Sequence, residues 1–239
     1  MAATNPPTMI PPLIHQTWKT SSAPLRWRHL VASVKRNHPG WTYRLWTDEE
    51  MDAHVRASHP ALHPVYAAFE KNVMRADVFR YVLMHDFGGL YCDLDYEFLR
   101  PYPYREAQVV LSEERSPGHG DGFLQVANYV FASVPGHLLW RNALDDLVRN
   151  PPAVQTVDDV VTATGPGFLT RIFLANREHY ERVVLTPRPV FSPHRRRGRD
   201  EGAELMRSGA FGVHHAWGSW KERLSAHYLR RKALRLLHR

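Results

Sequence analysis

Residues 72–95, NVMRADVFRYVLMHDFGGLYCDLD, carry the clearest structural signal in the chain. The stretch from Asn72 to Asp86 predicts a helix, which the pair Gly88–Gly89 ends. Leu90 to Cys92 then predict a short buried strand, and two aspartates follow that strand at once. A helix, a glycine turn and a buried strand in this order are typical of an α/β domain with a mostly parallel sheet. In such a sheet ligands bind beyond the carboxyl ends of the strands, where the two aspartates lie.

The rest of the chain alternates strand patterns with helix patterns. Trp41 to Trp46 alternates in the manner of a strand, and Thr47 with Glu50 forms a capping box for a helix that reaches about Ser58. Because no repeat or long linker divides the chain, we expect one α/β domain with helices flanking the sheet. Further strands are expected at residues 10–18, 96–99, 108–111 and 127–132, and further helices at residues 25–37 and 137–149 and in two pieces around 165–167.

The positive charge of the chain is unevenly distributed. The formal net charge is +7 over 239 residues, and residues 220–239 hold seven lysines and arginines against the single acid Glu222. Five alanines and leucines of this tail share one face of a helical wheel, with the basic side chains outside it. Such a basic amphipathic helix either lies on an anionic membrane surface or packs on its own domain. We therefore divide the chain into a nearly neutral body, residues 1–219, and a basic C-terminal helix, residues 220–239.

The remaining composition bears on the compartment. Cys92 is the single cysteine, which excludes an intramolecular disulfide and a four-cysteine zinc site and favours a reducing compartment. The sequence shows neither a signal peptide nor an apolar run long enough to span a bilayer. We therefore expect a cytoplasmic protein, which the basic tail would place peripherally at the inner membrane face.

Asp93 and Asp95 have the spacing of a cation site. Side chains two residues apart in an extended segment point to the same side, so both carboxylates face one way. Mg²⁺ and Mn²⁺ prefer oxygen ligands and keep positions open for phosphate oxygens. An ion held there would neutralise a diphosphate leaving group. Asp-x-Asp also occurs in many solvated turns, so this pattern depends on its surroundings.

Two charges interrupt the apolar run of the preceding helix. Asp77 and Arg80 are three residues apart, a spacing at which they can pair, and a buried charge must be paired or used. They form either a core salt bridge or a polar shelf on which Asp77 meets sugar hydroxyls and Arg80 a phosphate or the sugar. Asn128 likewise interrupts an apolar strand, and it either bonds a sugar hydroxyl or satisfies a turn.

Several ordered motifs resemble those of a known family. They are similar to the DXD-containing sugar transferases, glycosyltransferase family 32, which includes fungal outer-chain and sphingolipid mannosyltransferases and bacterial capsule enzymes; the clostridial glucosylating toxins have a similar core. Weaker matches extend the resemblance over roughly residues 10–220. The motifs are Ile14-His15-Gln16-Thr17-Trp18, Tyr43-Arg44-Leu45-Trp46-Thr47-Asp48, Arg75-Ala76-Asp77 with Arg80-Tyr81, and Gly88-Gly89-Leu90-Tyr91-Cys92-Asp93-Leu94-Asp95.

This resemblance implies a GT-A fold, a nucleotide-sugar donor, a divalent cation (Mn²⁺, or Mg²⁺) and retention of anomeric configuration. It makes Asp95 the direct metal ligand and Asp93 a ligand that also holds the donor. His215 is our choice for a further ligand, because a late histidine closes the site from the C-terminal side. His214 is the alternative, since adjacent residues face apart.

The resemblance also assigns the donor site. Trp18 is expected to face the base, Ser219 and Trp220 to close over the diphosphate, and Asn128 to lie near the reacting carbon. The residues expected to hold the donor are His15, Gln16, Trp18, Asp77, Arg80, Asp93, Ser219 and Trp220, and those expected in catalysis are Asp77, Arg80, Asp93, Asp95 and Asn128.

The expected function is therefore metal-dependent, retaining transfer of a hexose. The donor is a UDP- or GDP-sugar, and the acceptor is a hydroxyl of a glycan, of a lipid-linked sugar or of a surface polysaccharide. A metal-dependent phosphohydrolase or nucleotide-sugar hydrolase is an alternative, although no second acidic cluster of the two-metal type is visible. A non-catalytic carbohydrate-binding protein is another. The nearly neutral body and the lack of a nucleic-acid-binding motif argue against nucleic acid as a partner.

Overall fold

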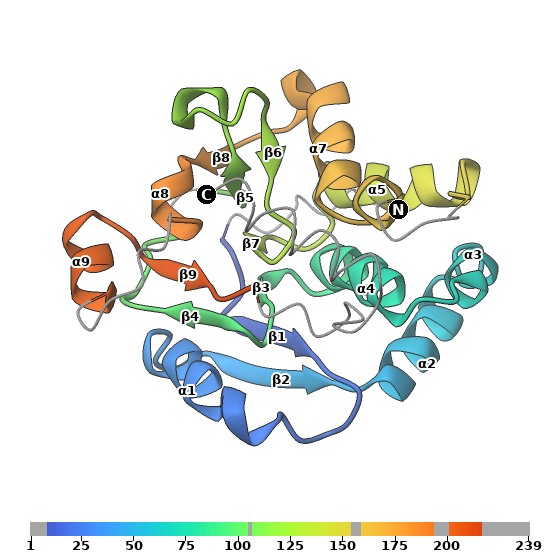
Figure 1. The fold of residues 1–239 in the computed structure, drawn as a ribbon. Coiled ribbons are helices and arrows are strands. Elements are labelled where there is room, and N and C mark those ends of the chain that lie inside the picture. The colour runs from blue at the N-terminus through green and yellow to red at the C-terminus, as the bar shows by residue number, and fades with distance from the viewer. Residues whose placement is uncertain (1–8, 105–106, 154–158, 194–200, 217–239) are drawn as a thin grey trace, which may run out of the picture.

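The computed structural model describes residues 9–104, 107–153, 159–193 and 201–216, and a seven-stranded sheet runs through them (Figure 1). The strands lie in the order β2-β1-β3-β7-β5-β6, and β8 also pairs with β5. Their bounds are β1 Leu13–Thr17, β2 Thr42–Trp46, β3 Gly89–Cys92, β5 Val109–Arg115, β6 Gln125–Val126, β7 Val130–Ser133 and β8 Val183–Thr186.

The sheet is mixed and mostly parallel, as the sequence predicts. Strands β1, β2 and β3 run parallel, with Ile14 opposite Tyr43 on one side and Leu90 on the other. Strand β7 runs antiparallel to both β3 and β5, β8 runs parallel to β5, and β6 antiparallel to it. Five of the seven strands therefore point the same way, and β6 and β7 point the other way. The expected α/β fold with helices on both faces is confirmed.

One face of the sheet is covered by a group of helices around the buried helix α4. This face takes Tyr91 of β3 and Phe131 of β7 into the larger apolar core, which continues through α4. The helices lie together on one side of the sheet in Figure 1. Their bounds are α2 Asp48–Ser58, α3 His63–Ala68, α4 Asn72–Asp86, α5 Leu138–Arg149 and α7 Pro166–Ala175, with the short α6, Asp159–Ala163, before the last.

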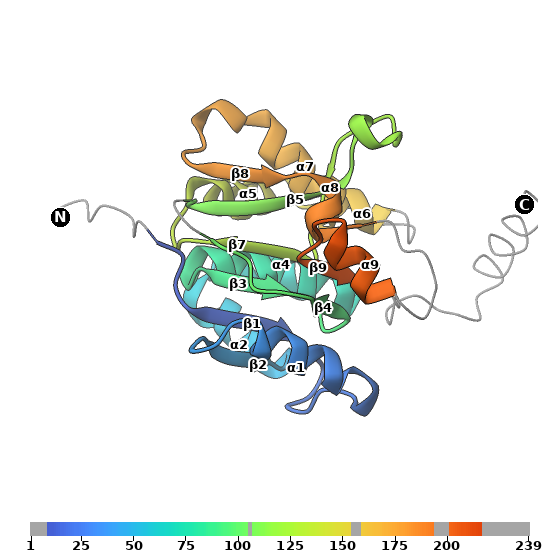
Figure 2. The same ribbon diagram turned by 90° about the vertical axis from the view of Figure 1, so that its left-hand side faces the viewer.

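The opposite face carries a smaller core. Leu90 and Cys92 of β3 alternate with Tyr91 and join this second core, which includes Tyr96 and Phe98. A separate pair of strands, β4 and β9, lies over this face with α1, α8 and α9 (Figure 2). Their bounds are α1 Arg28–Arg36, β4 Tyr96–Phe98, α8 Arg188–Phe191, α9 Glu201–Arg207 and β9 Gly212–His214, and the 3₁₀ turns are Leu25–Trp27, Pro117–His119 and Arg177–His179.

The glycine pair after α4 allows the tight turn into β3. Gly88 and Gly89 have φ angles of +64° and +88°, which favour glycine. A Cβ atom on Gly88 would lie 2.6 Å from the carbonyl oxygen of Ser133, and one on Gly89 would lie 2.5 Å from that of Leu13. Because both neighbours are backbone atoms of paired strands, the two glycines set how closely the turn approaches the sheet.

Most predicted elements are present, with shifted ends. The capping box is confirmed: the Glu50 amide donates to Thr47 Oγ1 at 3.2 Å, and the Thr47 amide donates to Glu50 Oε2 at 2.8 Å. The strand expected from residue 127 begins at Val130, since the chain bends at residues 128–129, where Asn128 meets Asp77 and Arg80 of α4. Elements α3, β6, β8, α8, α9 and β9 were not predicted.

The boundary at residue 219 and the basic tail lie outside the described residues. Within the described part of the chain, no helix has the length and apolar character that crossing a membrane requires.

Candidate active site

The acidic turn, residues 93–95, follows β3 and is held by backbone hydrogen bonds of Asp93. The Asp93 amide donates to the carbonyl oxygen of Tyr129 at 2.9 Å, and the Asp93 carbonyl oxygen accepts from the Tyr96 amide at 3.0 Å. The intervening Leu94 is buried in a small apolar cluster with Trp27. With Leu94 anchored in one direction, the carboxylates of Asp93 and Asp95 turn in the other.

A histidine from the far end of the described chain meets this pair. Strand β9 pairs with β4 so that His214 lies opposite Tyr96. Its Nε2 atom is 3.1 Å from Asp95 Oδ1 and 3.9 Å from Asp93 Oδ2. Its ring stacks on Tyr129, with 3.9 Å between ring centroids, which fixes the plane of the imidazole. Ligand atoms of Asp93, Asp95 and His214 all lie within 4.8 Å of one another.

His215 does not face the acidic pair, contrary to our choice from the sequence. Its Nε2 atom lies 2.9 Å from Glu97 Oε2, while its backbone amide donates to the carbonyl oxygen of Asp95 at 3.0 Å. Successive side chains of the β9 segment point to opposite sides, so only one of the two histidines can reach the carboxylates. The geometry therefore moves the predicted histidine ligand from His215 to His214.

Beside the acidic turn lies a buried polar network. Arg80 Nη2 is 3.0 Å from Asp77 Oδ1 and 3.5 Å from Asp93 Oδ1, and Arg80 Nη1 donates to the carbonyl oxygen of Asn128. The Asn128 side chain donates to Asp77 Oδ1 at 3.1 Å, and the Thr164 hydroxyl donates to Asp77 Oδ2 at 3.1 Å. Asp77, Arg80 and Asn128 are 3%, 5% and 7% exposed. Asp77 and Arg80 thus form a core salt bridge, and Arg80 also reaches Asp93 of the acidic turn.

The electrostatics of this network follow from its burial. Burial raises the pKa of Asp77 to about 6, an effect that Arg80 opposes and the nearby charge of Asp93 increases. Burial alone would lower the pKa of Arg80, but Asp93, Tyr91 and Asp77 outweigh it and raise the pKa. The Tyr91 hydroxyl donates to Asp93 Oδ1 at 2.7 Å, and burial holds the pKa of Tyr91 well above its usual value. A guanidinium and a phenol that both keep their protons therefore flank Asp93.

The residues expected to begin the nucleotide half have protein partners. His15 Nε2 donates to the Gly88 carbonyl oxygen at 3.0 Å, and its Nδ1 accepts from the Trp46 indole at 3.1 Å. Gln16 Nε2 donates to the Asp93 carbonyl oxygen at 3.1 Å. Both side chains are buried. His15 therefore positions the glycine turn before β3, and Gln16 positions the acidic turn after it, rather than presenting polar atoms to a ligand. Trp18 is half-buried and packs edge-on against Trp27, with 4.8 Å between centroids.

Some residues of the site were missed in the sequence. The Tyr91 hydroxyl donates to Asp93, the Thr164 hydroxyl donates to Asp77, and the ring of Tyr129 stacks on that of His214. Tyr91 and Tyr129 had a visible signal, because each lies within two residues of a predicted site residue. Thr164 had none, since it approaches α4 from 87 residues further along the chain. Ser219 and Trp220 lie outside the described residues.

The donor set fits a divalent cation. Two carboxylates and one imidazole at the carboxyl end of β3 offer oxygen and nitrogen ligands from converging segments. The imidazole makes the set more suitable for Mn²⁺ than for Mg²⁺, which favours oxygen ligands and water.

One comparison with known proteins spans the acidic turn. Residues 24–117 match the family model described as "Glycosyltransferase sugar-binding region containing DXD motif". Inositol phosphoceramide mannosyltransferase 2 of Schizosaccharomyces pombe is 32% identical over 193 residues, which are 78% of this chain and 51% of that protein. Mannosyl phosphorylinositol ceramide synthase SUR1 of Saccharomyces cerevisiae is 33% identical over 168 residues, 70% of this chain and 42% of that protein.

A solved structure supports the architecture. The structure titled PaToxG Glycosyltransferase superposes with a TM-score of 0.55 at 16% identity, covering 72% of this chain and 71% of its own. The likeness at this identity concerns the fold, which is of the GT-A type. The chain spans about half the length of the curated mannosyltransferases it matches. Residues 24–117 therefore match the DXD-containing region of this glycosyltransferase family, in a chain whose fold is of the GT-A type.

Proposed function

We propose that this chain is a metal-dependent, retaining glycosyltransferase. It moves a hexosyl group, by the names of its relatives a mannosyl group, from a UDP- or GDP-sugar to a hydroxyl of a lipid-linked sugar or other glycan. One observation carries the proposal: Asp93, Asp95 and His214 converge beside the buried network of Asp77 and Arg80. A cation set next to a fixed guanidinium is what a departing diphosphate requires.

The side chains divide the work of donor binding. Asp93, Asp95 and His214 would hold Mn²⁺, which supplies Lewis-acid stabilisation of a leaving diphosphate. Arg80 presents a fixed positive charge at the acidic turn, because Asp77 and Asn128 hold its guanidinium from behind. Asp77 is 3% exposed and accepts from three neighbours, so in this proposal it holds Arg80 and Asn128 in place beside the donor site.

The transfer step needs no protein base in this proposal. The acceptor oxygen bonds to the anomeric carbon on the face from which the phosphate oxygen leaves. The acceptor proton passes to that phosphate oxygen, so the configuration is retained and the products are the glycoside and the nucleoside diphosphate. Arg80 stabilises the charge that develops on the leaving group, and its fixed position means that little reorganisation accompanies the step.

The basic tail concerns location in this proposal. Most of the net charge lies in residues 220–239, far along the chain from the acidic residues of the site. We place these residues at an anionic lipid surface, where a lipid-linked acceptor would lie. The enzyme would then be cytoplasmic and peripheral at the inner face of a membrane.

A donor panel tests the proposed function. The full chain is incubated with Mn²⁺ and a series of UDP- and GDP-sugars, with and without mannosyl or inositol-containing acceptors. We expect one donor to be consumed faster when an acceptor is present, and NMR of the product to show the donor's anomeric configuration. Consumption of no donor, or inversion, would contradict the proposal. Equal donor cleavage without an acceptor would instead identify a nucleotide-sugar hydrolase.

A further inference from the structure

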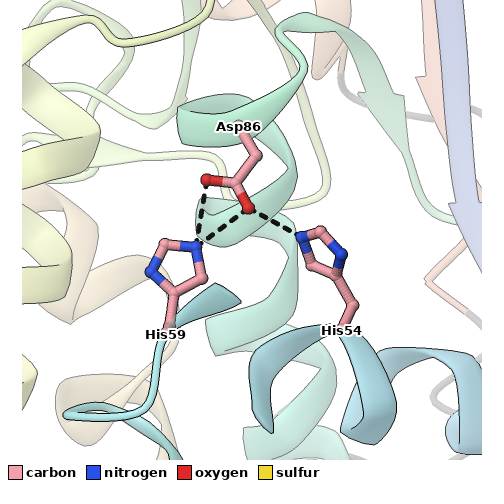
Figure 3. Close-up of side chains that lie close together, drawn as sticks. All are labelled: His54, His59 and Asp86. Carbon is pink, nitrogen blue, oxygen red and sulfur yellow. Dashed lines mark hydrogen bonds and ion pairs between the residues drawn. The ribbon is translucent and has the colours of Figure 1, made fainter. Parts of the chain in front are cut away.

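A second convergent group of side chains lies at the other end of helix α4. His54, His59 and Asp86 meet there, between α2 and the last residue of α4 (Figure 3). The Nε2 atom of His54 is 2.7 Å from Asp86 Oδ2, and that of His59 is 2.9 Å from the same oxygen. Asp77 of the candidate active site lies nine residues earlier on α4, about 13 Å along the helix axis. The group is therefore separate from the acidic turn.

The way α2 ends brings the two histidines together. On a continuous helix, residues five apart differ in direction by about 140°, so His54 and His59 would point apart. His59 is the C-cap of α2 and leaves the helical conformation, with φ −130° and ψ 61°. This break turns its ring back toward the side on which His54 projects. Figure 3 shows both rings directed at one carboxylate from below the end of α4.

The carboxylate of Asp86 is held by further partners. His85 Nδ1 lies 2.7 Å from Asp86 Oδ1, so three imidazoles surround a single carboxylate. Burial alone would raise the pKa of Asp86, but the hydrogen bonds from His59, His85 and His54 hold it well below its usual value. The side chains of His54, His59 and Asp86 are 20%, 15% and 16% exposed, so they are partly dry yet open to small ions. The C-terminus of a helix also favours a positive charge.

We propose that His54, His59 and Asp86 bind a divalent cation of the Zn²⁺ class. Two imidazoles and one carboxylate are a zinc-type donor set, whereas Mg²⁺ and Mn²⁺ favour sites richer in oxygen. The ligand atoms already lie within 4.8 Å of one another. Tetrahedral zinc with ordinary bond lengths separates neighbouring ligand atoms by about 3.3 Å, so the two contacts with Asp86 Oδ2, at 2.7 and 2.9 Å, would open by roughly half an ångström.

His85 is a positioning residue in this proposal. Its bond to Oδ1 orients the carboxylate and leaves Oδ2 for the cation, as partners of metal-ligating carboxylates commonly do. The cation ties the C-terminal end of α2 to that of α4. Because the ligands come together only in the folded chain, binding stabilises the fold rather than taking part in sugar transfer.

The test uses the full chain with the acidic turn silenced. Protein carrying Asp95→Asn is stripped with chelator and titrated with Zn²⁺ against a chromophoric chelator. We expect one tight Zn²⁺ per chain and, with Co²⁺, the intense visible absorption of four-coordinate cobalt. Adding His85→Gln should weaken Zn²⁺ about tenfold, and His54→Gln or Asp86→Asn, which remove direct ligands, should weaken it further. Adding His29→Gln, a change of an exposed histidine on α1, should leave the affinity unchanged.

Two results would overturn the proposal. One is an Asp95→Asn protein that retains no Zn²⁺ after gel filtration. The other is an unchanged affinity in both His54→Gln and Asp86→Asn proteins whose circular dichroism matches the parent. The cobalt spectrum is read on chains with all three ligands intact, so the conclusion does not depend on whether a variant folds. None of these readouts uses sugar transfer, so the outcome is independent of the proposed function.

Discussion

At the scale of single residues, the site depends on which of two adjacent histidines faces the acidic turn. His214 lies 3.1 Å from Asp95, and His215 lies on Glu97 instead. From the sequence we chose His215, and no pattern could secure that choice, because β9 is only three residues long and a shift by one residue exchanges its faces. The motif around Asp93 and Asp95 was readable, since an apolar strand precedes it directly.

We predict unequal effects of the two histidines on metal use. His214→Gln removes an imidazole from the acidic pair and should raise the Mn²⁺ concentration for half-maximal turnover by at least about tenfold. His215→Gln is the matched control, and it should leave that concentration within about twofold of wild type. Turnover measured against Mn²⁺ concentration tests both. A larger effect from His215→Gln would show that the ligand assignment is reversed.

At the scale of elements, the turn between α4 and β3 sets the position of the acidic pair. Gly88 and Gly89 allow the chain to pass close to β1 and β7, and the buried His15 connects the carbonyl of Gly88 to Trp46 of β2. The glycine pair and the buried strand were predicted, because their signals are local. The contacts of His15 were not, since they join residues 73 and 31 positions apart.

We predict that Gly89→Ala is strongly destabilising. Its φ of +88° disfavours a side chain, and the new Cβ would lie 2.5 Å from a backbone oxygen that cannot rotate away. The expected loss in the free energy of unfolding is about 3 kcal/mol or more. Gly120→Ala is the control, with a φ of +81° and nothing within 4 Å of the added Cβ, and it should cost about 1–2 kcal/mol. Urea unfolding measures both, and equal losses would contradict the steric account.

We also predict a pH dependence that arises from His15. Burial lowers its pKa from 6.5 to about 4, so below pH 6.5 the unfolded chain binds a proton that the folded chain does not. The contribution to stability is therefore present above pH 6.5 and is lost as the pH falls toward 4. A pKa difference of this size lowers the free energy of unfolding by about 3 kcal/mol between pH 6.5 and pH 4.

His15→Gln isolates this contribution. Between pH 6.5 and pH 4, the free energy of unfolding of wild type should fall more steeply than that of the variant, because all other titrating groups are shared. Urea unfolding at several pH values gives both curves. Parallel curves would show that His15 is charged in the folded protein.

Other elements were missed for reasons of size and exposure. Strand β8 has four residues and a half-exposed pattern, and α3 is a six-residue helix with a proline in its first turn. Neither is long enough to show a period of its own. Strand β8 forms because it pairs with β5, and α3 forms because it packs on α2 and α4. Both depend on the arrangement of the whole fold.

At the scale of the whole molecule, charge and chemistry lie in different parts of the chain. The site is built from mutually paired charges that are buried or partly buried, while residues 220–239 hold most of the net charge. The basic pI of about 9.7 therefore says little about the reaction. We propose that it bears instead on where the protein lies.

We predict that the tail binds anionic lipid. A chain ending at residue 220 should no longer sediment with liposomes that contain phosphatidylserine, whereas the full chain should, and the binding should weaken with salt. Turnover of a soluble acceptor should be the same for both. If the full chain never sediments with such liposomes, or the shortened chain does so equally, the tail has no role at the membrane.

The cation proposed for the acidic turn is tested by donor turnover in wild type and in Asp95→Asn. Wild type should release nucleoside diphosphate and form the glycoside only with Mn²⁺, and should stop when chelator removes it. Asp95→Asn should keep the thermal stability of the fold yet transfer on the order of 100-fold more slowly or less. Undiminished transfer by Asp95→Asn, or by chelator-treated wild type, would contradict the assignment.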